Sequence, residues 1–288
     1  MKPNDFRFVF GIGRSGTTWL STVLSQTLTP IRFLREPLHR KRCGDNFRTS
    51  IVYNQTLQAS EPLIEIYKSF LTDKCLCNRK RIIRNDSDKK YCFIKEVHGL
   101  LSIEALLNYF KCPAVLIIRD PLRVLDSLLC LPELNDTYLR EESKRMSQTF
   151  LEKFTTMKNT PFKIASRIAN VRSGLIAEKF LTITALNLML QTLHKQFSNT
   201  YLVKYEELCQ NPEDIFEDIF NFLDFKWDLS VLDFLRKTMF CSPQQEKIAR
   251  SFIRNTTEQK NKPFKYLSEE DRRFCKDLIT TKEYFNIC

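Results

Sequence analysis

The segment "FVFGIGRSGTTWL", residues 8–20, decides the fold of this chain. Gly11 and Gly16 have the spacing of the Walker A pattern G-x-x-x-x-G-K-[ST], but Thr17 stands at the lysine position and Thr18 at the following hydroxyl position. Before the loop, phenylalanines occupy every second position, the period of a strand; after it, apolar residues recur at helical spacing. The segment predicts a strand, a tight loop and a helix start, without the lysine that grips a γ-phosphate.

Glycine is scarce in this chain, and half of its glycines lie in this loop. Only 6 glycines occur among 288 residues, and three of them are Gly11, Gly13 and Gly16. We expect these positions to need a positive φ or a close ligand approach. Backbone N–H groups and the positive end of a helix dipole meet at such a junction, which favours a bound phosphate or sulfate. The alternative is an ordinary glycine-containing turn between strand and helix.

The length and composition of the chain suit one large globular α/β domain over residues 1–288. No linker, internal repeat or low-complexity tract divides it. The apolar stretch "LTITALNLMLQTL" at 181–193 has 13 residues and includes Thr and Asn, so it predicts a buried helix and not a membrane span. Because the first predicted strand begins almost at the N-terminus, we expect no signal peptide and a cytoplasmic protein.

Ten cysteines leave a second location open. Cys75 and Cys77 form a close pair, and with four N-x-[ST] matches, at positions 54, 85, 135 and 255, they would also suit a trimmed ectodomain in a secretory lumen. No C-x-x-C pair exists and the three histidines are scattered, so no metal site is predicted. We expect most of the cysteines to be small buried apolar residues.

The net charge of +11 predicts an anionic partner. Basic residues are spread along the chain apart from "HRKR" at 39–42 and "NRKRIIR" at 78–84, and no recognition helix or stacking motif accompanies them. Nucleic acid is therefore not the expected partner. A highly anionic cofactor or an acidic substrate explains the charge equally well.

Further apolar runs bounded by turns or charges predict strands at 91–95, 114–119 and 200–204. Helical patterns lie at 101–110, 121–130 and 177–197. Strands that alternate with helices and are apolar on both faces indicate a P-loop-like parallel sheet covered by helices on both faces. Ligands of such sheets bind at the carboxyl ends of the strands.

A second candidate anion site lies at one of these strand ends. Arg119 ends its strand, Asp120 can cap the next helix, Pro121 suits its first turn, and Ser127 follows about two turns later. A guanidinium with a nearby hydroxyl can bind a phosphate. Taken alone, R-D-P is more often a structural turn. Beside the glycine loop it indicates a ligand with two separated phosphates.

These segments resemble the sulfotransferases that use 3′-phosphoadenosine 5′-phosphosulfate (PAPS). "GIGRSGTTWL" is similar to their 5′-phosphosulfate loop, and "IIRDPLRVLDS" is similar to their 3′-phosphate motif, with arginine and serine eight residues apart. "YLVKYEELCQNPEDIFEDIFNFLDF" at 201–225 resembles the later V-x-Y-E-D-L segment. "RFLREPLHR" and "FIKEVHGLLSIEALL" look most like the carbohydrate branch, in which one strand ends in F-E-P-L and a later one in K-D-V-R. The resemblance covers roughly residues 6–280.

The resemblance implies PAPS as cosubstrate and no metal. The residues that it implies for the cosubstrate are Arg14, Ser15, Gly16, Thr17, Thr18 and Trp19 at the 5′ end, and Arg119, Ser127 and Arg254 at the 3′ end. Sulfuryl transfer needs no Mg²⁺ bridge between two phosphates, so the missing Walker lysine is no defect. Arg14 would instead neutralise charge on the leaving phosphate oxygen.

A C-terminal segment also resembles the family. Residues 251–274 are similar to the loop that closes over the nucleotide, with Phe264 and Lys265 where relatives have Trp-Arg or Trp-Lys. For Arg254 an ordinary surface arginine is the alternative to a phosphate contact. Tyr205, Glu206 and Glu207 are expected to support the fold.

An acceptor hydroxyl has to lose a proton, and Glu36 is the first candidate for the base. It follows an apolar run, precedes Pro37 and matches the glutamate of F-E-P. The alternative is that Glu36 only pairs with Arg35 or Arg40. His98 is the second candidate, because cytosolic members of the family place a histidine base two residues after a lysine. Here His98 stands three residues after Lys95, and either a substrate contact or a structural role is open to it.

The residues point to a carbohydrate acceptor. The basic stretch that follows Glu36 would attract an anionic or polymeric glycan, whereas phenols need an apolar, aromatic-lined pocket. The alternative for that stretch is a solvated face. Two other functions remain open: a P-loop nucleotide kinase, which should carry the absent lysine, and a non-catalytic anion- or nucleotide-binding protein.

Overall fold

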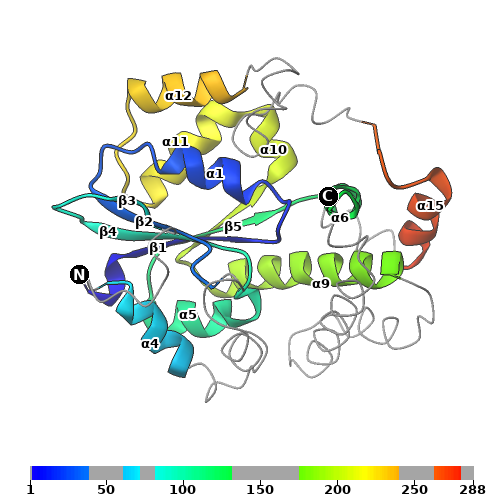
Figure 1. Ribbon diagram of the computed structural model, residues 1–288, viewed down its shortest axis with the longest axis horizontal. Coiled ribbons are helices and arrows are strands. Elements are labelled where there is room, and N and C mark those ends of the chain that lie inside the picture. Colours follow the sequence, from blue (N-terminus) through cyan, green and yellow to red (C-terminus); the bar gives the residue numbers. More distant parts are fainter. Residues whose placement is uncertain (1, 39–60, 72–81, 132–174, 240–262, 280–288) are drawn as a thin grey trace.

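The computed structural model describes residues 2–38, 61–71, 82–131, 175–239 and 263–279 (Figure 1). They contain a six-stranded sheet with the order β3-β2-β4-β1-β5-β6. Its strands are β1 (Phe6–Gly11), β2 (Ile31–Arg35), β3 (Ile82–Asn85), β4 (Tyr91–Glu96), β5 (Ala114–Ile118) and β6 (Thr200–Lys204). All pairings are parallel except that of β3 with β2, which is antiparallel.

Helices cover both faces of the sheet (Figure 1). One face packs against α1 (Thr17–Leu24), α10 (Tyr205–Gln210), α11 (Pro212–Phe222) and α12 (Leu229–Met239). The other packs against α4 (Glu61–Ser69), α5 (Ile103–Phe110), α6 (Pro121–Leu129), α9 (Leu175–Gln196) and α15 (Glu269–Asp277). Strand β1 shows why: Phe6, Phe8 and Phe10 enter the second core and Val9 enters the first, so both faces are apolar.

The predicted fold class is confirmed, and one strand was missed. Every expected strand and helix is present, with ends that differ by at most two residues, and α5 follows a 3₁₀ turn at Leu100–Ser102. The edge strand β3 overlaps the end of the basic stretch 78–84, where charge hides the strand pattern. Its four residues alternate between half-buried and exposed, which is too short a run for periodicity to show. The sheet is therefore mixed and not wholly parallel.

Helix α9 contains the apolar stretch 181–193, and its side chains form part of the core, as expected. Among the described residues no helix combines the length and hydropathy that a bilayer crossing requires. Of the five cysteines in the described part of the chain, Cys92, Cys112 and Cys275 are buried, whereas Cys130 is exposed. The pair Cys75 and Cys77 lies outside the described residues, so location stays a prediction.

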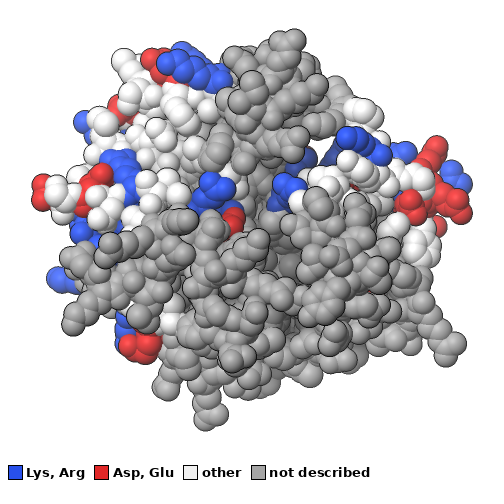
Figure 2. All heavy atoms as spheres, viewed as in Figure 1, with Lys and Arg blue, Asp and Glu red and all other residues white. Residues whose placement is uncertain are grey.

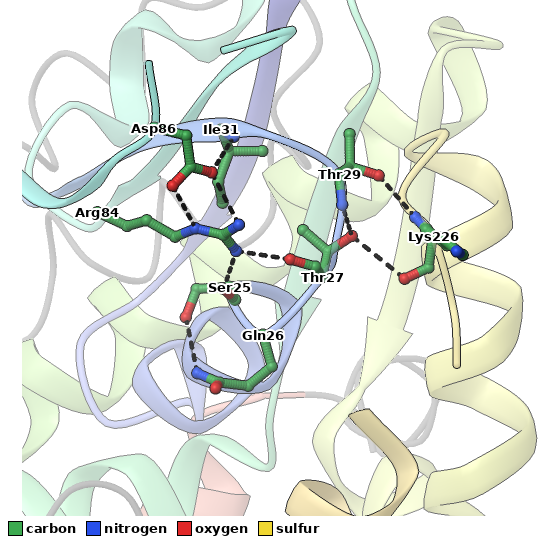
Figure 3. A network of polar contacts seen from close by, with 8 residues as sticks. All are labelled: Ser25, Gln26, Thr27, Thr29, Ile31, Arg84, Asp86 and Lys226. Atoms are coloured by element: carbon green, nitrogen blue, oxygen red, sulfur yellow. Dashed lines mark hydrogen bonds and ion pairs between the residues drawn. The ribbon is translucent and has the colours of Figure 1, made fainter. Parts of the chain in front are cut away.

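A polar network fixes the C-terminal end of α1 to the sheet (Figure 3). Arg84 of β3 donates from Nη1 to the carbonyls of Ser25 at 2.9 Å and Thr27 at 2.6 Å. Its Nη2 lies 2.7 Å from Asp86 Oδ2, and the same oxygen accepts the N–H of Ile31 at 2.8 Å. One guanidinium thus connects the end of α1, the start of β2 and the edge strand.

Replacing Arg84 should destabilise the fold. Arg84→Met leaves two carbonyls and a carboxylate without their donor, so we expect the free energy of unfolding to fall by about 2–3 kcal/mol. Urea denaturation measures the change. The matched control is Arg236→Met, because Arg236 and Glu213 form an exposed pair with side chains 51% and 40% exposed, and its loss should leave stability nearly unchanged. Equal effects of the two changes would contradict the structural role of the network.

Candidate active site

The loop between β1 and α1 needs glycine at two positions. Gly16 has φ +92, and a Cβ there would lie 2.3 Å from Tyr205 Cδ2. A Cβ on Gly11 would lie 2.5 Å from Ile117 Cγ2 of the neighbouring strand. Gly13 has no such neighbour within 4 Å, so its predicted need for glycine is not explained by crowding within the described protein. The chain therefore turns tightly over β5 and Tyr205 before α1 begins.

The start of α1 is arranged as an anion site. Gly16 is the N-cap residue and supplies no side-chain oxygen, so the first N–H groups of the helix, on Thr17 and Thr18, have no side-chain cap. Ser15 is fully buried, and its Oγ has no hydrogen-bond partner within the described structure. A buried hydroxyl without a partner is costly unless a ligand satisfies it. These groups are what a bound phosphate or sulfate requires.

Arg119 lies directly beside this loop. Its Nη1 donates to the Arg14 carbonyl at 2.8 Å, and its Cζ lies 4.3 Å from the centroid of the Tyr205 ring. The residue is only 9% exposed, and its buried Nε has no partner among the described residues. Asp120 caps α6 as expected, accepting the N–H of Leu122 at 2.8 Å. The two predicted anion sites therefore touch each other.

One support of Arg119 escaped sequence reasoning, and another was expected. Asn187 of α9 is fully buried and donates from Nδ2 to the Arg119 carbonyl at 2.7 Å. Glu206 accepts the N–H of Asp120 at 3.1 Å, in agreement with its expected role in the fold. Tyr205, expected only to support the fold, contacts both anion-binding elements. An asparagine in a long apolar helix was the available signal, since a buried amide needs a partner.

The remaining predicted cosubstrate residues lie in different surroundings. Arg14 is exposed and has φ 75, and its Nη2 lies 3.9 Å from Cys130 Sγ. Ser127 lies half-buried on α6, one residue after Asp126. The Trp19 indole is 1% exposed in the core and donates to Thr238 Oγ1 at 3.1 Å, so its side chain faces away from any ligand of the loop. Arg254 lies outside the described residues.

The C-terminal segment is attached to α6 next to Ser127. Asp126 Oδ1 accepts the backbone N–H groups of Lys265, Tyr266 and Leu267 at 3.1, 2.7 and 3.0 Å. The Phe264 ring lies 4.0 Å from Arg123 Cζ and 4.6 Å from Arg272 Cζ. The segment that was expected to close over the nucleotide therefore reaches the helix that carries the proposed 3′-phosphate serine.

Both candidate bases lie at the carboxyl ends of β2 and β4. Glu36 forms an ion pair with Lys95, and the two side chains are 17% and 2% exposed. Arg35 also acts on the charge of Glu36, and Arg40 lies outside the described residues. Burial would raise the pKa of the Glu36 carboxyl, but the Lys95 ammonium outweighs burial and holds that pKa below its usual value. Glu36 is therefore a carboxylate at neutral pH, the form that accepts a proton.

Glu96 is a further carboxylate of this region, which sequence reasoning did not select. It is fully buried at the end of β4, and Oε1 accepts the N–H groups of Val97 and His98, both at 2.8 Å. Burial raises the pKa of the Glu96 carboxyl to about 7, against the opposing effect of its backbone donors. His98 is thus fixed through its backbone by a neighbour that titrates near neutrality.

The two halves of the site are separated by one strand. Strand β4 lies between β2 and β1, and Arg35 is in register with Lys95 while Phe10 is in register with Glu96. Neighbouring strands are 4.7–4.9 Å apart, so the strand that leads to Glu36 and the strand that leads to the loop are about 10 Å apart. A sulfuryl group and an attacking hydroxyl fit within such a spacing.

The anion-binding half fits the adenosine 3′,5′-bisphosphate part of PAPS. Ser15 Oγ and Arg119 Nε are buried polar atoms without partners, and the uncapped start of α1 lies beside them. They can bind an anion with two separated charged groups. Among the described residues no group of His, Cys, Asp and Glu could hold a metal ion.

Comparison with known proteins bears on the fold and the family of this chain. Residues 5–280 match the model of the sulfotransferase domain family. Among curated protein sequences none matches the chain significantly. Similar solved structures include a sulfotransferase from Alicyclobacillus acidocaldarius, with TM-score 0.46, 13% identity and coverage of 87% of this chain and 92% of that chain. Mouse sulfotransferase SULT7A1 complexed with PAP has TM-score 0.46, 16% identity and coverage of 98% and 85%.

The family match extends over nearly the whole chain, and it decides against a nucleotide kinase and against a non-catalytic binding protein. Because residues 5–280 of 288 match, the chain belongs to the sulfotransferase domain family and is a PAPS-dependent sulfotransferase.

Proposed function

We propose that this enzyme moves the sulfuryl group of PAPS to a hydroxyl of a carbohydrate, with Glu36 as the base. The observation that supports this most is the Glu36–Lys95 pair, a carboxylate kept ionised at the same sheet edge as the anion-binding loop. PAPS supplies the activated sulfuryl group. The protein has to hold its two charged ends, admit a hydroxyl between loop and carboxylate, and remove one proton.

The 5′ end of the cosubstrate belongs at the loop. The N–H groups at the start of α1 and the Ser15 hydroxyl bind the charged oxygens there. Arg14 is exposed beside them and neutralises the charge that develops on the leaving phosphate oxygen. Arg119 and Ser127 bind the 3′ phosphate, and the bond from Arg119 to the Arg14 carbonyl keeps the two ends at a fixed separation.

Glu36 removes the acceptor proton. At neutral pH its carboxylate has an oxygen that can accept the hydroxyl proton as the acceptor attacks. Lys95 keeps the carboxylate oriented through their ion pair, while burial lowers the pKa of the Lys95 ammonium against the opposing effect of Glu36. His98 is the alternative base; it lies close enough to Glu36 to help lower the pKa of that carboxyl. Mutation of Glu36 and of His98 shows which of the two residues is the base.

A carbohydrate acceptor is supported by charge and by the resemblance of the segment around Glu36. Lysine and arginine side chains lie near the middle of the face shown in Figure 2, over the sheet and toward the ends of its strands. The net charge of +11 would attract a polyanionic chain toward them. The basic residues at 39–42, on which the prediction first rested, lie outside the described residues.

The 3′-phosphate role is tested with Arg119→Ala. We expect affinity for adenosine 3′,5′-bisphosphate to fall about 10- to 150-fold, since a charge-assisted contact contributes about 1.5–3 kcal/mol. Arg119 also holds the loop backbone, so some loss for adenosine 5′-phosphate is expected as well, and the difference between the two ligands is the decisive quantity. Calorimetry measures both, and equal losses would contradict the assignment.

The base is tested with Glu36→Gln and His98→Ala. Glu36→Gln should lower turnover by about 10²-fold or more and leave the affinity for adenosine 3′,5′-bisphosphate nearly unchanged. The change leaves Lys95 without its ion partner, so thermal unfolding is followed in parallel; a variant that failed only through unfolding would lose nucleotide affinity too. A slow His98→Ala enzyme beside a normal Glu36→Gln enzyme would make the histidine the base.

The acceptor class is tested by PAPS consumption with glycosaminoglycans, neutral oligosaccharides and simple phenols at two ionic strengths. We expect turnover with the anionic glycans, weakened by salt, because charges farther apart than about 8–10 Å are screened at 0.1–0.15 M salt. Turnover with phenols alone would rule out the carbohydrate assignment. Glycan turnover that does not respond to salt would contradict the electrostatic argument for an anionic carbohydrate acceptor.

A further inference from the structure

Glu96 connects the two turns that carry the candidate bases. Its Oε2 accepts the N–H of Leu38 at 3.1 Å, and its Oε1 accepts those of Val97 and His98 at 2.8 Å. Leu38 follows Glu36 by two residues, and the other two donors directly follow β4. A Cβ on Gly99 would lie 3.0 Å from Leu38 Cδ1 and 3.7 Å from Glu96 Cγ, so the two turns pack tightly.

The turn at Glu36 needs such an anchor. Glu36 has φ +51, in the left-handed region, although it is not glycine. It also precedes proline, which favours an extended backbone at this position. A strained backbone conformation of this kind persists only when several surrounding contacts hold it in place. Glu36 N–H donates to the Lys95 carbonyl at 2.7 Å, and Glu96 fixes the turn from its other side through Leu38.

We propose that Glu96 is a positioning residue of this enzyme, whose carboxylate holds the Glu36 turn and the His98 turn together. The functional part of the proposal rests on the proposed role of Glu36. The structural part, that one carboxylate determines both turns, stands on the three hydrogen bonds alone.

The charge state of Glu96 then matters. A carboxylate can accept all three N–H groups, whereas the protonated carboxyl turns one oxygen into a donor and weakens the contact with Leu38. The charged side chains that interact with Glu96 in the described structure are Glu36 and Lys95. Arg35 and His98 act in turn on Glu36, and Tyr67 Oη would lie 3.8 Å from a Cβ on Gly99. Of these, Glu36 adds to the effect of burial on the pKa of Glu96.

The titration of Glu96 makes the stability of the fold depend on pH. The pKa of Glu96 is about 7 in the folded protein and 4.5 in the reference state, so the folded form binds more protons between these values. The contribution of Glu96 to stability therefore falls as the pH rises from about 4.5 to about 7 and is constant above. Glu96→Gln should abolish this slope, and above pH 7 the variant should be at least as stable as the wild type.

The first test is nuclear magnetic resonance of the ligand-free full chain. In the wild type we expect the amide protons of Leu38, Val97 and His98 to shift together with one midpoint near pH 7, and in Glu96→Gln to stay flat. The glutamine carbonyl can still accept from the N–H groups after β4, but its NH₂ group cannot accept from Leu38. Exchange of the Leu38 amide should therefore be about 10-fold faster or more in the variant.

The second test separates positioning from a purely structural role. With an acceptor from the panel above, Glu96→Gln at pH 8 should lower kcat by about 10-fold or more, leave KM for PAPS within about two-fold, and show no loss of stability. The control is Glu104→Gln, an exposed glutamate of α5, which should change neither exchange nor turnover.

Each outcome has one meaning. Unchanged Leu38 exchange, or amide shifts that do not titrate in the wild type, would overturn the proposal. Normal turnover in Glu96→Gln would overturn its functional part even with the shifts present. If the wild type fails to bind adenosine 3′,5′-bisphosphate in the same samples, the proposed function is wrong. The amide shifts and exchange rates still test whether Glu96 holds the two turns together.

Discussion

The hydrogen bond from Arg119 Nη1 to the Arg14 carbonyl, 2.8 Å long, is the contact on which the geometry of the site depends. It joins the end of β5 to the loop after β1. Arg14 has φ 75, which lets the backbone oxygen accept from β5 while the side chain is exposed. Arg119 is in turn fixed by Asn187 at its carbonyl and by the Tyr205 ring below its guanidinium. Neither anion site can move without the other, so the spacing between them is set before a ligand arrives.

On the proposed acceptor side, in contrast to the anion-binding side, the charged side chains are buried. Lys95 at 2% exposure is tolerable only with Glu36 beside it, since removing one partner of a buried pair leaves an uncompensated charge. Glu96 adds a second carboxylate, for which burial has a free-energy cost that three backbone donors only partly offset. A fold optimised for stability alone would not place two carboxylates here. Two buried carboxylates fit the proposed role of this site in accepting a proton, for which some stability would be given up.

The sequence was sufficient where local pattern decides structure. The alternating phenylalanines of β1, the apolar run of β5 and the Asp120 cap with Pro121 all took the predicted form, because both faces of the sheet are buried and the helix start uses local chemistry. Residues whose role depends on distant partners were missed. Asn187 lies 68 residues from the carbonyl that it binds, and Glu96 lies 58 residues from Leu38. Trp19 stands beside the loop in sequence, yet helical geometry turns its indole into the core, whereas Tyr205 comes from β6 and α10 to contact Gly16.

The order of the strands explains how one sheet can serve two tasks. The nucleotide half rests on β1 and β5, and the acceptor half on β2 and β4, so β1 and β4 are the only neighbours across the boundary. Their parallel register fixes Phe10 against Glu96, both fully buried, and gives the boundary little freedom to shift. In the proposed arrangement, changes around Glu36 could alter the choice of acceptor without disturbing Arg14 or Arg119. The missing Walker lysine fits the same proposed division, in which the loop has only to hold an anion and the proton is removed two strands away.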